Sequence, residues 1–164
     1  MKTRFLAASV VALFAVPALA SDGIRITDPF ARSAHGMSQS GAAFMTIENH
    51  GVTDRRLIAA RSDAAARVEL HTHVEDDEGV MRMVEVEEFL IPAHGTHALE
   101  RGGDHIMFMG IAQSFDHGAE VSVTLVFDDG AEMELIVPVD LERGADHGHS
   151  GSQDDDHGHS DSHD

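Results

Sequence analysis

Residues 117–139 read HGAEVSVTLVFDDGAEMELIVPV, and this stretch decides the class of fold. Apolar residues alternate with polar ones on both sides of the turn signal Asp128-Asp129-Gly130, as in a β-hairpin that buries one face. Short runs of the same kind lie at 23–33, 42–49, 56–60, 67–70, 80–86, 90–92, 96–100 and 105–111, the first interrupted by the turn signal Asp28-Pro29. Only 62–66 suggests a single turn of helix. The pattern predicts an all-β protein, built as an antiparallel sandwich or barrel.

The first 20 residues have the composition of a secretory signal peptide. Lys2 and Arg4 precede an apolar run at 5–16, which is followed by the small-residue pattern Ala-Leu-Ala at 18–20. The run is too short to span a bilayer with a stop-transfer flank. We therefore expect cleavage after Ala20, export to the periplasm and a soluble mature protein without a transmembrane segment. The core then belongs to one domain at 21–141.

The composition changes abruptly at the other end of the chain. Residues 142–164 read ERGADHGHSGSQDDDHGHSDSHD and contain no large apolar residue, so this tail is expected to be disordered. The tail holds five of the 13 histidines, in a repeat of Asp-His-Gly-His-Ser: His147, His149, His157, His159 and His163. A His-rich acidic tract is typical of metal binding, and a solvated solubility tail is the alternative interpretation.

Charge and cysteine content exclude several classes of function. Eleven basic residues against 29 acidic ones give a formal net charge of −18, which suits neither nucleic acid nor an anionic membrane surface. The chain has no cysteine. Disulfides, iron–sulfur clusters, thiolate zinc sites and the cysteine ligand of a blue-copper centre are therefore excluded.

Imidazoles and thioethers recur in two short runs, HTHVEDDEGVMRM at 71–83 and HIMFM at 105–109. In a strand, residues two apart point to the same face, which groups His71 with His73 and His105 with Met107. Thioether sulfur is a good ligand for Cu(I), and imidazole serves copper in either oxidation state. We therefore expect a Cu(I) site rather than an enzyme centre, which would favour a mostly imidazole set. Four other methionines are expected to fill the core: Met45, Met81, Met109 and Met133.

Several of these motifs resemble the PCu(A)C-type periplasmic copper chaperones (DUF461-like). The resemblance lies in AAFMTIENHG at 42–51, VELH at 68–71, GVMRM at 79–83 and LIPAHGTHALERGGDHIMFMGI at 90–111. The family's metal pattern is a His, ten residues, a Met, twenty-one residues, then His, any residue, Met. Met83, His105 and Met107 match it, whereas eleven residues separate His71 from Met83 and nine separate His73 from it. The approach Val68-Glu69-Leu70 favours His71 as the first ligand, with His73 as an alternative or additional one.

The resemblance implies a cupredoxin-like fold with an exposed Cu(I) site of His71, Met83, His105 and Met107. It also implies delivery of copper to the dinuclear copper centre of cytochrome c oxidase, directly to the copper-bearing subunit or together with a thiol-containing assembly protein. The resemblance also implies capture of Cu(II) by a His- and Met-rich C-terminal extension. This tail has His but no Met, so we expect it to collect Cu(II), zinc or both. The alternative function is a periplasmic copper or zinc buffer without a dedicated acceptor.

Overall fold

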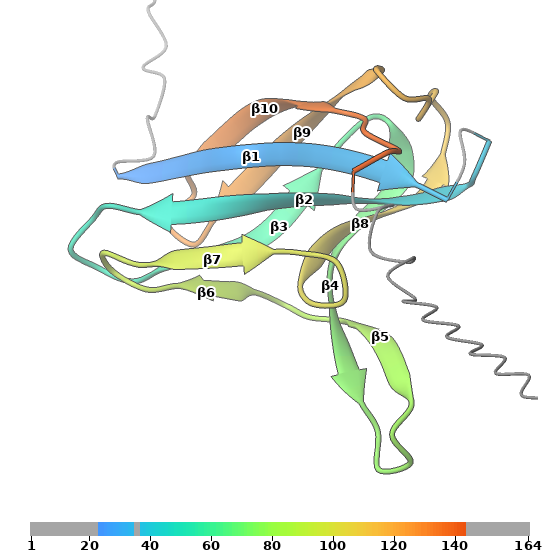
Figure 1. The fold of residues 1–164 in the computed structure, drawn as a ribbon. Coiled ribbons are helices and arrows are strands. Elements are labelled where there is room, and N and C mark those ends of the chain that lie inside the picture. The colour runs from blue at the N-terminus through green and yellow to red at the C-terminus, as the bar shows by residue number, and fades with distance from the viewer. Residues whose placement is uncertain (1–22, 35–36, 144–164) are drawn as a thin grey trace, which may run out of the picture.

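The computed structural model describes residues 23–34 and 37–143, which form ten β-strands (Figure 1). The strands are β1 (Ile24–Ser33), β2 (Ser40–Asn49), β3 (Arg55–Arg61), β4 (Ala65–Glu75), β5 (Met81–Glu85), β6 (Phe89–Ile91), β7 (Thr96–Leu99), β8 (His105–Ile111), β9 (Glu120–Phe127) and β10 (Glu132–Pro138). The expected signal peptide and all five tail histidines lie outside the described residues. No helix in the described part of the chain has the length and apolarity needed to cross a membrane.

The strands form two antiparallel sheets. One follows the order β1-β2-β8-β4-β5, with β7 also pairing with β2, and the other follows β10-β9-β3-β6. Ala31 of β1 forms a bridge with Val139, just after β10, which brings the two sheets together along one side. The prediction of an all-β antiparallel architecture is confirmed.

The hairpin predicted at 117–139 supplies much of one wall of the core. It is made of β9 and β10, which pair in continuous register from Glu132↔Val126 to Pro138↔Glu120. The alternating side chains Val121, Val123, Leu125 and Phe127 are at most 1% exposed, as the period-two pattern requires. They pack with residues of the other sheet, such as Ile47, Ile106 and Phe108. Each fully buried side chain of this size contributes roughly 1.5–3 kcal/mol to folding.

Three local expectations are corrected by the structure. The signal Asp28-Pro29 does not interrupt β1; it makes a bulge in which the register shifts between Thr27 and Phe30 and Asp28 adopts a φ of +55°. No helical turn forms at 62–66, where a tight turn leads directly into β4. β4 is longer than the strand predicted at 67–70. It reaches Glu75, because pairing with β5 extends it well beyond residue 70.

The methionine predictions divide into two groups. Met45 is buried and Met133 packs against the core, as expected. Met81 is 54% exposed, so its assignment to the core is wrong. Met109 is partly buried but lies outside the core cluster, and its sulfur is 3.3 Å from an Arg67 guanidinium nitrogen. Both exceptions lie on strand faces that alternation alone could not assign to the inside or the outside.

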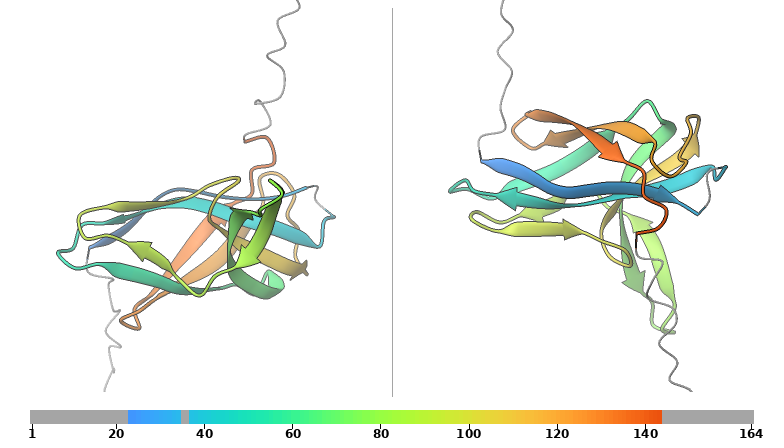
Figure 2. Two further views of the ribbon diagram at one scale, coloured as in Figure 1. Left: turned by 90° about the horizontal axis from the view of Figure 1, so that it is seen from below. Right: turned by 45° about the horizontal axis from the view of Figure 1, so that its top comes forward.

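The β4–β5 hairpin stands out from the body of the two sheets (Figure 1; right view of Figure 2). Every residue of β5 is exposed, and β5 ends its sheet. The connecting loop is organised by Asp76, whose carboxylate accepts hydrogen bonds from the backbone N–H groups of Val80 and Glu78 and from Arg82. The hydrogen bond from Val80 is the main cause that lowers the pKa of Asp76. This loop sets the register that places Met83 opposite His73.

Candidate metal centre

The expected ligands gather on the outer face of the larger sheet. Directly opposite residues in paired strands point to the same side. His71 is opposite His105, and His73 is opposite Met83. Met107 is two residues beyond His105 and therefore shares its face. The alternate residues of the same strands, such as Leu70 and Ile106, point into the core. Strand pairing therefore brings together residues that lie far apart in the sequence.

A pocket of about 250 Å³ opens at this point of the sheet. It is lined by Ala42, Phe44, His73, Met83, Arg101, Gly102, His105 and Met107. Three of the four primary candidates therefore line one pocket together with the alternative ligand His73. His71 is not among the lining residues, although its ring centroid is 5.9 Å from that of His105. The ring of His73 is 5.2 Å from His105.

Hydrogen bonds determine which ring nitrogen of His73 and of His105 remains available to bind a metal. Nδ1 of His105 lies 2.9 Å from the carbonyl oxygen of Gly103, and Nδ1 of His73 lies 3.2 Å from the same oxygen. Because a carbonyl oxygen only accepts, both Nδ1 atoms donate, and both Nε2 atoms keep a lone pair. Histidines that bind metals usually donate their other N–H in this way, which holds the ring in position. Nε2 of His105 is buried and has no hydrogen-bond partner within the described structure.

His71 has the complementary arrangement. Its Nε2 lies 3.0 Å from a carboxylate oxygen of Glu69, to which it donates. Its Nδ1 is buried and, among the residues described, has no partner. A buried polar atom without a partner costs about 1–3 kcal/mol. Two such nitrogens on adjacent rings are therefore a specific reason to expect a bound cation.

The electrostatic surroundings keep His105 in its metal-binding form. His105 is 2% exposed, and this burial is the main cause that lowers its pKa, with nearby His73 and His71 adding to the effect. The hydrogen bond to Gly103 opposes the shift. A lowered pKa keeps the imidazole neutral, which is the form that binds a metal.

The donor set has to be mixed. Over 23–34 and 37–143, no three side chains of His, Asp or Glu come close enough to hold a metal by themselves. Met83 is 44% exposed, Met107 and His73 are partly buried and His105 is 2% exposed, so Met83 stands at the mouth of the pocket and His105 at its base. A mixed set of this kind suits a soft ion.

Sequence reasoning did not find three contributors to this site. Glu69 could have been found, because it precedes His71 by two residues and therefore shares its face. Gly103 acts through its backbone carbonyl, which no side-chain pattern signals. Phe44 comes from β2, and its ring is 6.2 Å from that of His105. Its place beside the site depends on the pairing of β2 with β8.

Comparison with known proteins identifies the family to which the chain belongs. The family model described as "Putative lipoprotein LpqE-like" matches residues 24–139. The chain belongs to the LpqE-like family. A protein of Leifsonia xyli subsp. xyli (strain CTCB07), named "Putative lipoprotein Lxx21020", is 35% identical over 137 residues, which are 82% of this chain and 80% of that protein.

Solved structures place the LpqE-like chain among PCuAC domains. It resembles the apo solution structure of DR1885 from Deinococcus radiodurans with 26% identity and a TM-score of 0.58, over 87% of this chain and 98% of that one. It resembles the copper-bound PCuAC domain from PmoF2 with 20% identity and a TM-score of 0.61, over 73% and 93% of the two chains. The resemblance to PCu(A)C-type proteins and the expected cupredoxin-like fold are both confirmed.

Proposed function

We propose that this LpqE-like protein is an exported copper chaperone that holds Cu(I) with His71, Met83, His105 and Met107. The observation that carries the proposal is the buried, unpartnered Nε2 of His105, which lines one pocket with two thioethers, next to the equally unpartnered Nδ1 of the neighbouring His71. The structure of DR1885 with Cu(I), which is 27% identical to this chain, supports copper as the ion. His73 is available as an additional donor from the same face.

The first prediction concerns the oxidation state. A protein ending at Arg143 is expected to bind one Cu(I) tightly and Cu(II) much more weakly, because two of its four ligands are soft sulfur atoms. Anaerobic titration with Cu(I), in competition with a chelator of known affinity, and a parallel titration with Cu(II) measure both. Cu(II) binding that is as tight as Cu(I) binding would contradict the proposed ligands.

The second prediction concerns the first histidine. His71→Ala is expected to weaken Cu(I) binding by about 100-fold or more, since even groups that only support a ligand are often worth about 10–100-fold. His73→Ala is expected to cost less, because His73 leaves no buried nitrogen without a partner. The place of His73 in the pocket lining favours the opposite order. If His73→Ala proves the more damaging change, His73 is the ligand and His71 supports it.

For delivery, we propose the dinuclear copper centre of cytochrome c oxidase, reached through its copper-bearing subunit or a thiol-containing assembly protein. The exposed position of Met83 supports transfer, because an incoming ligand can approach the metal from solvent. Oxidase activity of a deletion strain at limiting copper tests this. Normal activity would favour the alternative function, a copper or zinc buffer.

The proposed location is the periplasm, after cleavage of the signal peptide behind Ala20.

For the tail, we propose collection of Cu(II). Five imidazoles on an acidic segment without large apolar residues can surround this ion without a preformed cavity, and the tether keeps the ion at a high effective concentration near the Cu(I) site. The composition of 142–164 supports this role. Zinc remains the alternative metal for the tail.

A further inference from the structure

The last described residue, Arg143, is fixed to the outer face of β1. Its guanidinium donates a hydrogen bond of 2.5 Å to Asp28 and lies 4.5 Å from the centre of the Phe30 ring. Its carbonyl oxygen accepts a 2.8 Å hydrogen bond from Arg32, and its N–H donates to Asp140 over 3.0 Å. These four contacts, here called the Arg143 clamp, involve both the backbone and the side chain. The clamp determines where residues 144–164 leave the folded domain.

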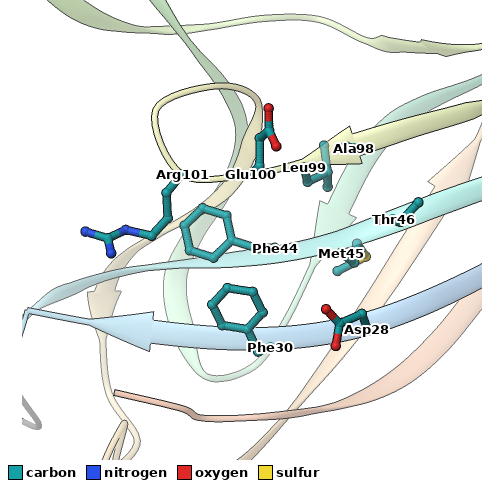
Figure 3. A pocket seen from close by; sticks show the side chains of 9 residues that line it. All are labelled: Asp28, Phe30, Phe44, Met45, Thr46, Ala98, Leu99, Glu100 and Arg101. Atoms are coloured by element: carbon teal, nitrogen blue, oxygen red, sulfur yellow. The ribbon is translucent and has the colours of Figure 1, made fainter. Parts of the chain in front are cut away.

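A row of aromatic rings leads from the clamp to the copper pocket. The Phe30 and Phe44 rings are 5.1 Å apart, and the ring of His105 lies 6.2 Å beyond Phe44. Between the clamp and the copper pocket lies a groove of about 220 Å³ whose lining includes Asp28, Phe30, Phe44 and Arg101 (Figure 3). Phe44 and Arg101 also line the copper pocket. The groove therefore joins the origin of the tail to the proposed Cu(I) site.

The length of the tail is sufficient for the path from Arg143 over Phe30 and Phe44 to His105, whose steps are 4.5, 5.1 and 6.2 Å. An extended chain advances about 3.3 Å per residue, so His147 reaches about 13 Å from Arg143 and His149 about 20 Å. For a flexible chain, the root-mean-square reach is about 5–6 Å times the square root of the number of residues. This gives about 11 Å for His147 and about 25 Å for His163. All five histidines of the tail can therefore approach the pocket without release of the clamp.

The groove is lined by two carboxylates and one arginine, and further arginines around it supply positive charge for the acidic tail. Residues 144–164 contain six aspartates and no Lys or Arg. Arg101 lies next to Phe44, and its guanidinium points away from the other residues of the groove (Figure 3). Arg32, which bonds the backbone of Arg143, lines an adjoining hollow together with Arg101, Met83 and Met107. The groove also contains Glu100 and Asp28, but Asp28 is paired with Arg143. In a protein with a net charge of −18, this is a suitable surface for an acidic segment.

We infer that the chain's own tail occupies this groove, with the Arg143 clamp as its fixed origin and with His147 and His149 brought to the mouth of the copper pocket. The inference rests on the proposed copper site, and it adds a docking surface and a positioning residue. Arg143 acts through the tail and does not itself contact the metal. An external one-electron reductant converts the tail-bound Cu(II) to Cu(I), and the tail then delivers this ion along a short fixed path rather than by a free search.

A metal-free experiment tests the docking. Because the chain has no cysteine, Ser150→Cys carries a single nitroxide spin label in the tail. Paramagnetic broadening of backbone NMR signals is expected to be strongest around Phe44 and Arg101 and weak at the distant turn that contains His94. Arg143→Gln is expected to weaken the broadening at the groove. Arg61→Gln is the matched control, because it breaks an exposed ion pair with Glu132 on the other sheet.

Even broadening over the whole domain, or an unchanged pattern in Arg143→Gln, would overturn the inference and leave the groove to a partner protein.

A second measurement follows loading of the Cu(I) site from tail-bound Cu(II) with a reductant. Arg143→Gln removes the two side-chain contacts, and full release, including the two backbone hydrogen bonds, would lengthen the segment before His147 from four residues to about seven, counted from Asp140. Effective concentration falls with about the −3/2 power of length, so loading should slow by up to about twofold. Equal loading rates in wild type and Arg143→Gln would also contradict the clamp's role, whereas failure of the tail to bind Cu(II) would count only against the proposed function.

Discussion

Met83→Leu and Met107→Leu are each expected to weaken Cu(I) binding by about 100-fold or more, which corresponds to about 2.7 kcal/mol. Leucine keeps the volume and the apolar character of methionine but has no sulfur lone pair, so the metal loses a soft ligand while the pocket keeps its shape. Folding stability should change by less than about 1.5 kcal/mol, since volume-conserving exchanges are usually tolerated. Anaerobic competition titrations give the affinity, and thermal unfolding of the metal-free variants gives the stability.

Each strand offers its own matched control. Met81 shares the face of Met83 on β5, and Met109 shares the face of Met107 on β8, but neither lines the copper pocket. Met81→Leu and Met109→Leu should therefore leave the Cu(I) affinity within about threefold of wild type, a change of less than about 0.7 kcal/mol. If a control variant loses as much affinity as Met83→Leu or Met107→Leu, the metal lies farther along the strand than proposed.

Removal of residues 144–164 is expected to abolish most Cu(II) uptake and to leave the Cu(I) affinity nearly unchanged. All five tail histidines are lost, whereas the pocket and the Arg143 clamp remain. This deletion is cleaner than one that begins at 142, because Arg143 belongs to the folded domain. Equilibrium dialysis measures the Cu(II) bound per chain. If the shortened protein binds as much Cu(II) as the full chain, the tail has another role, such as solubility or zinc binding.

The two kinds of site are expected to respond differently to pH. Imidazole binds a metal only when it is neutral, so Cu(II) capture by the tail should fade as the pH falls below about 6.5, the ordinary value for histidine. Thioether sulfur does not titrate, and burial lowers the pKa of His105, so this imidazole stays neutral to a lower pH. Cu(I) binding should therefore persist to a lower pH than Cu(II) capture. Titrations of the full chain between about pH 5 and 7.5 measure Cu(I) binding and Cu(II) binding separately. If both are lost over the same pH range, the two metals are not held by two different kinds of site.

The sequence by itself determined the class of fold and most of the candidate ligands. Period-two alternation with regular turn signals is a local property, so β9, β10 and most other strands could be located from short windows. The spacing among Met83, His105 and Met107 likewise follows from counting residues. The absence of cysteine limits the metal chemistry through composition alone, because no arrangement of this chain can supply a thiolate ligand.

The tertiary structure decided which of these residues meet and which face they share. The extent of β4, the outward position of Met81 and the place of Gly103 beneath two imidazoles all depend on strand pairing between distant segments. A shift of one residue in register would move every side chain of a strand to the other face, and local sequence does not fix that choice. The Arg143 clamp depends on a contact between residues 115 positions apart, Asp28 and Arg143, which only the folded chain brings together.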